Sequence, residues 1–276
     1  TAAPFYAAST TADSTTTKDD KYEILKRSGE YEVEDGYPVM YNIAVCRGEE
    51  VECPFLIAGV KGLVQKIKDR LKEIGYSKLL ISRIEGKILP HQRLKIAISS
   101  CPNACSQPQI KDFGVHLRAK VVVDSEIKCN GCRNCLRSCK ENAIKISGLS
   151  GRHHDTTPEK REREVTIHYK RCIHCGLCAE VCPTGSIKKE KQCFRVMIGG
   201  KLGRHPRFAD DLVEFADESD VLKALDTCID AILSEKSEKR FGTLVEKLGI
   251  EEFKRRMESE DFNPMRHANR KETICT

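Results

Sequence analysis

The sequence predicts an α+β fold into which a small cysteine-rich module is inserted. Between residues 37 and 99, apolar runs of strand length surround one run with helical periodicity, which gives the order βαββ. Another strand-like run, FRVMIGG, begins at Phe194 and resumes this pattern. The stretch between the two parts holds two cysteine runs of the same spacing, CxxCxxCxxxC. We therefore expect one domain whose chain leaves and returns around an insert.

The first strand and helix are predicted from the spacing of apolar residues. Residues 37–45, YPVMYNIAV, have the composition of a strand and lead directly into Cys46. Residues 55–75 predict a helix that ends at Gly75, because glycine commonly terminates helices. The apolar side chains of this segment fall on one helical stripe: Leu56, Val60, Leu63, Val64, Ile67 and Leu71.

The remaining elements of the domain follow from the same patterns. Residues 78–84 and 93–99 predict two strands, and the second delivers Cys101 to the region of its carboxyl end. After the insert and the strand that starts at Phe194, two amphipathic helices are predicted at residues 220–236 and 241–258. They are expected to close the domain.

Domain boundaries are placed where the composition changes. The amino-terminal segment is rich in Thr, Ala, Ser and Asp and is expected to be disordered or bound by a partner. It is followed by the first part of the domain, the insert and the second part. In this order, the predicted segments are residues 1–20, 21–124, 125–191 and 192–276.

Composition excludes several classes of function. The net charge of +6 comes from 47 basic and 41 acidic residues that are largely interleaved, and the chain has no tryptophan, so nucleic-acid binding is not expected. No apolar run approaches the roughly eighteen residues of a membrane helix, which argues against direct membrane insertion. The fifteen cysteines have metal-ligand spacings and no signal peptide is evident, so we expect a cytoplasmic, anaerobic protein.

The twin cysteine runs predict two 4Fe-4S clusters. In this spacing, three cysteines wrap one cluster and the fourth ligates the other. The first set is accordingly Cys129, Cys132, Cys135 and Cys182, and the second set is Cys172, Cys175, Cys178 and Cys139. Zinc binding or disulfides are the alternatives, but neither chemistry favours two copies of this spacing.

A further group of cysteines, the third set, consists of two pairs about fifty residues apart: Cys46, Cys53, Cys101 and Cys105. Two pairs at neighbouring strand ends would supply the four thiolates of another 4Fe-4S cluster. The alternative is two buried cysteines and a chance CxxxC pair, since free cysteine is among the most buried residue types. The spacing alone leaves both interpretations open.

Two sequence boxes resemble a known family. The CPNAC box followed by IKDFG, and the later box IGGKLGRHP, are similar to the sirohaem and iron-sulfur half of nitrite and sulfite reductases. With a two-cluster ferredoxin insert between the boxes, the chain resembles the small sirohaem-type subunit of anaerobic sulfite reductases. The resemblance implies a sulfite-reductase-like α/β domain interrupted by a bacterial-type dicluster ferredoxin module.

The resemblance also implies roles for particular residues. It makes the third set the ligands of a third 4Fe-4S cluster, with Cys105 bridging to a sirohaem iron. In the second box, sirohaem contacts are implied for three glycines and four basic side chains: Gly199, Gly200, Gly203, Lys201, Arg204, His205 and Arg207. We predict catalytic roles for Cys105, Lys201, Arg204 and Arg207. Without the resemblance, the box is a glycine turn followed by a solvated basic loop.

The family normally carries a preceding half that grips the substrate anion, and only about twenty-five globular residues precede Cys46 here. The resemblance therefore implies an oligomer or a complex with other redox subunits or an electron donor protein. Two functions are retained: a subunit of a sulfite or nitrite reductase with sirohaem, or an electron-transfer subunit with two or three clusters and no sirohaem. Purely structural clusters are disfavoured, because a duplicated module holds clusters as a relay does.

Overall fold

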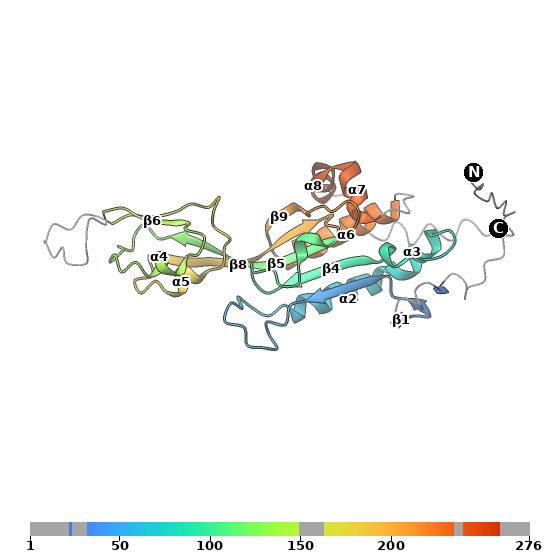
Figure 1. The fold of residues 1–276 in the computed structure, drawn as a ribbon, viewed down its shortest axis with the longest axis horizontal. Coiled ribbons are helices and arrows are strands. Elements are labelled where there is room, and N and C mark those ends of the chain that lie inside the picture. The colour runs from blue at the N-terminus through green and yellow to red at the C-terminus, as the bar shows by residue number, and fades with distance from the viewer. Residues whose placement is uncertain (1–21, 24–31, 149–162, 235–239, 260–276) are drawn as a thin grey trace, which may run out of the picture.

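A five-stranded sheet organises the part of the chain that the computed structural model describes, residues 22–23, 32–148, 163–234 and 240–259. The tail predicted at residues 1–20 lies outside these ranges. Figure 1 shows the sheet and its helices together, with an extended module to one side. Its strand order is β3-β4-β5-β8-β9, and the first three strands are parallel while β8 and β9 run antiparallel. The bounds are β3 Tyr41–Val45, β4 Leu94–Ser99, β5 Phe113–Val123, β8 Ile187–Ile198 and β9 Asp210–Ala216. The mixed α and β architecture predicted from the sequence is confirmed.

The helices pack against one face of this sheet. Alternate strand residues such as Ile96, Ile98 and Val115 are fully buried and share one apolar cluster with the helices. Alternation is expected because successive strand side chains point to opposite faces. The helices of this layer are α2 Lys61–Ile74, α3 Tyr76–Arg83, α6 Glu218–Ser234, α7 Phe241–Leu248 and α8 Ile250–Glu258. A two-stranded ribbon precedes them, β1 Val33–Glu34 with β2 Tyr37–Pro38.

The strand predicted at residues 78–84 is wrong, because this segment is part of helix α3. Gly75 adopts a left-handed conformation that ends α2 and begins α3 directly, without a change to extended backbone. Tyr76 and Leu80 are buried one helical turn apart, as a helix requires. A short apolar run does not distinguish a buried strand from a buried helix by periodicity.

The helix predicted at residues 55–75 begins at Lys61, six residues later than expected. The residues before it form an irregular loop that contains Cys46 and Cys53. The Glu49 carboxylate in this loop accepts the N–H groups of Val60, at 2.5 Å, and Lys61, at 3.2 Å. A carboxylate at this position stabilises a helix amino terminus. Glu49 thus fixes the start of α2 from within the cysteine loop.

Two further differences concern the carboxyl-terminal part. The single helix predicted at residues 241–258 is two helices, because Gly249 has a φ of 80° and interrupts the helical hydrogen bonds. Strand β9 was not predicted, because three acidic residues in its sequence, DDLVEFA, obscure the alternation of apolar and polar side chains. It forms an edge of the sheet beside β8. The helix predicted at residues 220–236 is confirmed as α6.

A two-stranded ribbon, formed by β5 and β8, connects the module to the main domain. β4 pairs with β5 only between Phe113 and His116, whereas β8 pairs along β5 as far as Val123. The ribbon therefore continues past the sheet and into the module (Figure 1). Within the module lie α4 Asn134–Ser138, β6 Ile144–Ile146, β7 Val165–Ile167 and α5 Leu177–Glu180, around a separate apolar cluster. The exact domain boundaries stay a prediction.

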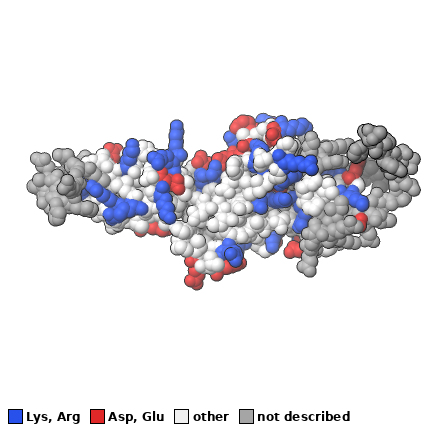
Figure 2. Space-filling view, in the orientation of Figure 1, with Lys and Arg blue, Asp and Glu red and all other residues white. Residues whose placement is uncertain are grey.

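The surface mixes charges of both signs. Figure 2 shows basic side chains beside acidic ones on the visible face, with several on the module. Lys188 lies 2.7 Å from Asp124 and Lys120 lies 2.6 Å from Glu190. No helix among the described residues has both the length and the apolar character needed to cross a membrane.

Gly114 provides a test of this packing. A Cβ at this position would lie 2.2 Å from the Pro108 carbonyl oxygen, whereas a Cβ on Gly62 would have no atom within 4 Å. We expect Gly114→Ala to lower the free energy of unfolding by about 1–3 kcal/mol, as overpacking does. Gly62→Ala, in α2, should leave it unchanged or raise it by about 0.5 kcal/mol. Thermal unfolding followed by circular dichroism measures both; equal effects would contradict this packing.

Candidate iron-sulfur centres

The eight cysteines of the twin runs lie in two groups of four. Burial raises the pKa of the Cys135 thiol, and the other three thiols of the first set raise it further. Burial also raises the pKa of Cys178, to about 12, with added contributions from the other three members of the second set. The four cysteines of each predicted set therefore lie close to one another. Three of them belong to one run, and one belongs to the other run. The fourth cysteine of each run crosses to the other group.

Backbone N–H groups point at several of these sulfurs. Three such hydrogen bonds have a donor-to-sulfur distance of 3.4 Å: Gly131 N–H to Cys129, Ala143 N–H to Cys139 and His174 N–H to Cys172. The left-handed backbone at Gly131 and His174 turns the chain tightly at two of these positions. Hydrogen bonds to cluster sulfurs are one of the levers that set reduction potentials.

Cys182 has a distinct environment. Burial acts to raise the pKa of its thiol, but hydrogen bonds involving Ser186 and Thr184 outweigh it and lower the pKa to about 7. The Cys182 sulfur lies 3.4 Å from the Ser186 hydroxyl and 3.6 Å from the Thr184 hydroxyl. Hydroxyl donors favour the thiolate, the form that ligates metals. The two hydroxyl groups therefore favour the form of Cys182 in which it would ligate iron.

The third set gathers where two parallel strands end. β3 leads into Cys46, whose N–H donates to Ile98 of β4 at 3.1 Å, and β4 leads into Cys101. Ser100 N–H donates to the Cys46 sulfur at 3.2 Å. Burial raises the pKa of Cys101, and Cys105, Cys46 and Cys53 raise it further. The two cysteine pairs, distant in sequence, therefore share one site.

The short turn of the CPNAC box separates its two cysteines. Ala104 adopts a φ of 54° and donates its N–H to the Cys101 carbonyl oxygen at 3.2 Å. Cys101 is buried by this turn, whereas Cys105 is exposed. The exposed thiol is the one for which the resemblance implies a bridge to sirohaem.

The donor chemistry of the three sets fits 4Fe-4S clusters. All cysteines among the described residues are free thiols. No three His, Cys, Asp or Glu side chains in the described part of the chain converge on one point, as a single ion requires. A 4Fe-4S cluster instead takes each of its four cysteines at a different iron, so the sulfurs surround a volume. The four cysteines of the second set line one cavity, and N–H groups donate to sulfurs in all three sets, which fits this requirement.

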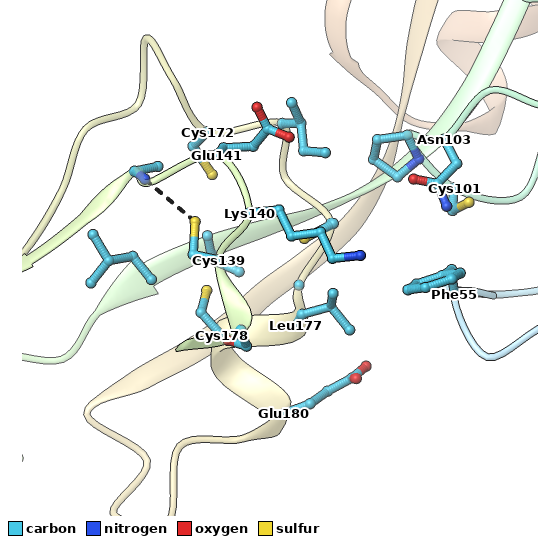
Figure 3. A pocket seen from close by; sticks show the side chains of 18 of the residues that line it. Phe55, Cys101, Asn103, Cys139, Lys140, Glu141, Cys172, Leu177, Cys178 and Glu180 are labelled. Carbon is cyan, nitrogen blue, oxygen red and sulfur yellow. Dashed lines mark hydrogen bonds between the residues drawn. The ribbon is translucent and has the colours of Figure 1, made fainter. Parts of the chain in front are cut away.

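A cavity of about 220 Å³ connects the second set with the third. All four cysteines of the second set line it, together with Cys101, Pro102 and Asn103 from the CPNAC box. Figure 3 shows Cys139, Cys172 and Cys178 on one side and Cys101 with Phe55 on the other. None of the four cysteines of the first set lines the cavity.

Two residues reach across this cavity. The Lys140 ammonium lies 6.0 Å from the centre of the Phe55 ring, and Figure 3 shows the lysine extending towards that ring. Lys140 follows Cys139 in the module, and Phe55 lies two positions after Cys53 in the main domain. Sequence spacing alone does not predict that these two side chains meet. Their adjacency to predicted ligands was the available signal.

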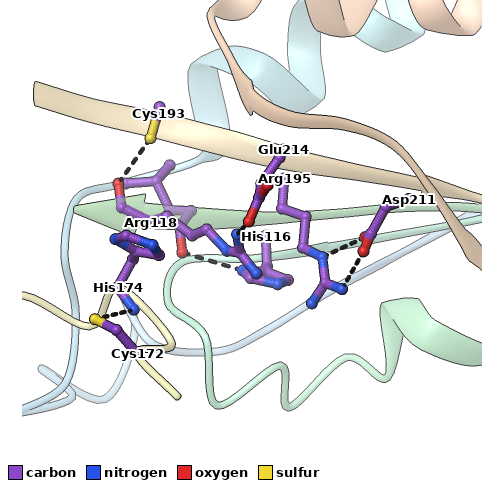
Figure 4. A network of polar contacts seen from close by, with 9 residues as sticks. His116, Arg118, Cys172, His174, Cys193, Arg195, Asp211 and Glu214 are labelled. Atoms are coloured by element: carbon purple, nitrogen blue, oxygen red, sulfur yellow. Dashed lines mark hydrogen bonds and ion pairs between the residues drawn. The ribbon is translucent and has the colours of Figure 1, made fainter. Parts of the chain in front are cut away.

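The loop of the second set is anchored on the sheet. Ala119 N–H of β5 donates to the His174 carbonyl oxygen at 2.8 Å, and the His174 ring meets the Phe215 ring of β9 edge-on, with centroids 5.0 Å apart. Figure 4 shows Arg118 beside this histidine. Arg118 is buried and pairs with Glu214 of β9 at 3.2 Å. These contacts fix the second set relative to the strands that carry the third.

The basic box IGGKLGRHP is engaged mainly with the rest of the chain. Lys201 is buried, and its ammonium lies 3.0 Å from the Glu246 carboxylate and 3.0 Å from the Thr243 hydroxyl. Arg207 forms an ion pair with Asp210 and donates to the Gly199 carbonyl oxygen at 2.9 Å. These contacts hold the loop on α7 and β9. The implied sirohaem roles of both residues stay predictions.

The other members of this box differ in exposure. A Cβ at Gly199 or Gly200 would collide with neighbouring atoms, at 2.7 Å from Arg207 and 2.6 Å from the Gln109 carbonyl oxygen. Both positions therefore require glycine, because neighbouring parts of the chain leave no room for a side chain. Gly203 has an open surrounding and a φ of 121°. Arg204 and His205 are exposed beside it.

The third set can be tested by counting acid-labile sulfide. We expect Cys101→Ser to remove about four sulfides per chain, the content of one 4Fe-4S cluster. Cys193→Ser is the matched control, because Cys193 is also buried but belongs to none of the three sets, and its sulfur donates to the Arg118 carbonyl oxygen at 3.7 Å. Sulfide analysis of the anaerobically purified variants measures both. Equal sulfide content in the two variants would show that Cys101 holds no cluster.

His116 predicts a pH dependence of stability. It is 2% exposed on the sheet face opposite the core and appears near Arg118 in Figure 4. Burial lowers its pKa from 6.5 to about 4, so the unfolded chain binds a proton that the folded chain does not. The stability contributed by neutral His116 is complete above pH 6.5 and is lost as the pH falls towards 4. The loss between pH 6.5 and about pH 5 is roughly 2 kcal/mol.

The variant His116→Gln cannot take up this proton. We expect its melting temperature to fall less than that of the wild type between about pH 7 and about pH 5. Thermal unfolding at both pH values gives the comparison. The same decrease in both proteins would assign the acid sensitivity to other groups.

Parts of this chain are similar to known proteins. An uncharacterised protein of Methanocaldococcus jannaschii is 29% identical over 182 residues, which are 64% of this chain and 58% of that protein. A coenzyme F420-dependent sulfite reductase of the same organism is 48% identical over 56 residues, 20% of this chain and 9% of that enzyme. The chain thus spans less than two thirds of either relative.

A solved structure shares the fold. The crystal structure of dissimilatory sulfite reductase I superposes with a TM-score of 0.50 at 14% identity, covering 83% of this chain and 53% of that one. The sequence profile of one family matches residues 37–264, which include the cysteines of all three sets. This chain belongs to the nitrite and sulphite reductase 4Fe-4S domain family.

Proposed function

We propose that the chain is the iron-sulfur redox subunit of a sulfite- or nitrite-reductase-like complex. In this proposal the first and second sets each hold a ferredoxin-type 4Fe-4S cluster, and the third set holds another beside a sirohaem. Family membership and the relation to a sulfite reductase support an oxidoreductase setting with iron-sulfur chemistry. The number of clusters and the sirohaem are the finer part of the proposal.

The cavity that the second set lines together with Cys101 of the third set is the observation that carries this proposal. A subunit that only stored iron or stiffened its fold would have no need to hold two cysteine sets across one space. Here the ribbon of β5 and β8 projects the module so that its second set faces the strand ends of the third. When bound, the clusters supply one-electron transfer and a sirohaem supplies an iron at which an anion is reduced.

Different residues of the chain would then hold the clusters, stabilise charge on the sulfurs and contact a cofactor. The three cysteine sets position the clusters, and backbone N–H groups at Cys129, Cys139, Cys172 and Cys46 stabilise negative charge on the sulfurs. Exposed Cys105 is available to a cofactor outside the sheet edge. Exposed Arg204 is the cation of its loop best placed to meet cofactor carboxylates, since Lys201 and Arg207 already have acidic partners.

Those acidic partners favour a second candidate function. With Glu246 on Lys201 and Asp210 on Arg207, two of the predicted cofactor cations are neutralised inside the chain. A subunit that transfers electrons through two or three clusters without sirohaem would need no free cations there. It would pass electrons to a separate catalytic subunit.

Partners and location complete the proposal. We infer assembly with other redox subunits or an electron donor protein, and an oligomer that covers the exposed side of the third set. An anaerobic cytoplasm is the proposed location, because reduced thiols and clusters persist there. Nucleic-acid binding and membrane insertion have no part in it.

The cofactor content distinguishes the two functions. We expect the anaerobically purified chain to contain about twelve acid-labile sulfides, as three 4Fe-4S clusters require, and to show the visible absorption of sirohaem. The same sulfide content without that absorption, in the chain and in its complex, would support the electron-transfer subunit alone. About eight sulfides would contradict the third cluster.

A further inference from the structure

The two ferredoxin-type sites are not equivalent in their relation to the third set. All four cysteines of the second set line the 220 Å³ cavity that reaches Cys101, and no cysteine of the first set does so. In the sequence, the two runs have the same spacing, so the spacing does not show which set lies nearer to the third. The fold therefore introduces an order that the motif lacks.

We propose that the second set is the inner site, which exchanges electrons with the third site across this cavity, and that the first set is the outer site, which faces an external electron donor. This inference rests on the proposed function, because it requires a redox centre at the third set. It adds the direction of transfer and the face of the module at which a donor protein binds.

Anchoring supports the inner position of the second set. Its loop bonds to β5 through Ala119 and His174, and a Cβ on Gly176 would lie 2.9 Å from the Ala119 Cβ, so the loop packs closely on the strand. The His174 ring also contacts Phe215 of β9. Since β5 and β4 belong to one sheet, the second and third sets are held by the same rigid element.

The surroundings of the first set fit an outer position. Its loop carries exposed Asn130 and Arg137, and exposed Val181 precedes Cys182. Arg137 donates to the Cys132 carbonyl oxygen at 3.1 Å, within its own loop. None of these residues lines the cavity. A donor protein that reached this face would be close to the first set and would have the second set behind it.

Phe55 and Lys140 are positioning residues in this scheme. Phe55 lines the cavity on the main-domain side and Lys140 lines it on the module side, and their contact joins the two sides. A contact between the two sides keeps the separation of the sites fixed. Neither residue is a predicted ligand, so changing it leaves the cysteine sets intact.

Magnetic coupling between reduced centres tests the order. Through-space coupling falls steeply with distance, so the centre beside the third set dominates the broadening of its electron paramagnetic resonance signal. We expect Cys175→Ser, in the second set, to abolish this broadening in the dithionite-reduced full chain. Cys132→Ser, its matched control in the first set, should preserve it. Broadening lost in Cys132→Ser and kept in Cys175→Ser would overturn the proposed order.

Sulfide content separates this failure from failure of the proposed function. Wild-type chain with about eight sulfides lacks the third centre, which overturns the function and the inference together. About twelve sulfides with the reversed coupling pattern overturns the inference alone.

A second variant keeps the test independent of cluster loss. Phe55→Ala should retain the wild-type sulfide content but slow the reduction of the third centre by a reduced two-cluster ferredoxin, followed by rapid-freeze resonance spectra. Phe208→Ala is the control, because Phe208 is 75% exposed and lines no part of the cavity. Equal rates in the two variants would overturn the cavity as the route.

Discussion

The parallel pairing of β3 with β4 is the constraint on which the rest of the site depends. Because parallel neighbours end at the same edge, the residues that follow them are brought together whatever their distance along the chain. Cys46 and Cys101 are separated in sequence by two helices. The Cys46 N–H nevertheless donates to the carbonyl oxygen of Ile98, three residues before Cys101. The helices α2 and α3 are the crossover that this pairing requires. The third set exists because of this connection.

The module depends on the same sheet in a different way. β5 continues the parallel pairing and then extends beyond its neighbour, and β8 returns antiparallel along it. This ribbon carries sixty or so residues out of the domain and brings them back in register, so the insert does not disturb the core. The anchoring of His174 on β5 and β9 then turns one of the two cysteine sets towards the strand ends. An electron relay needs such a fixed orientation more than it needs additional ligands.

Much of this could be predicted from the sequence, for identifiable reasons. The metal-ligand spacing of the twin runs is local, so the crossing of Cys139 and Cys182 between sets followed from it. The strand that leads into Cys101 was equally clear from its apolar residues. The helix at Tyr76–Arg83 was not, because its short apolar run suits either element and only packing against α6 decides it. Glu246, the partner of Lys201, lies on a helix whose position depends on the tertiary fold, so sequence spacing does not indicate this pair. The contact of Phe55 with Lys140 has the same origin.

In the proposed relay, three iron centres lie in a row, with the second set between the first and the third. Diffraction at the iron absorption edge from crystals of the anaerobically purified chain locates such centres without reference to their activity. We predict three iron peaks, one at each cysteine set, with the peak at Cys139, Cys172, Cys175 and Cys178 adjacent to the peak at Cys46, Cys53, Cys101 and Cys105. The absence of a peak at the third set, or a third peak adjacent to the first set, would contradict it.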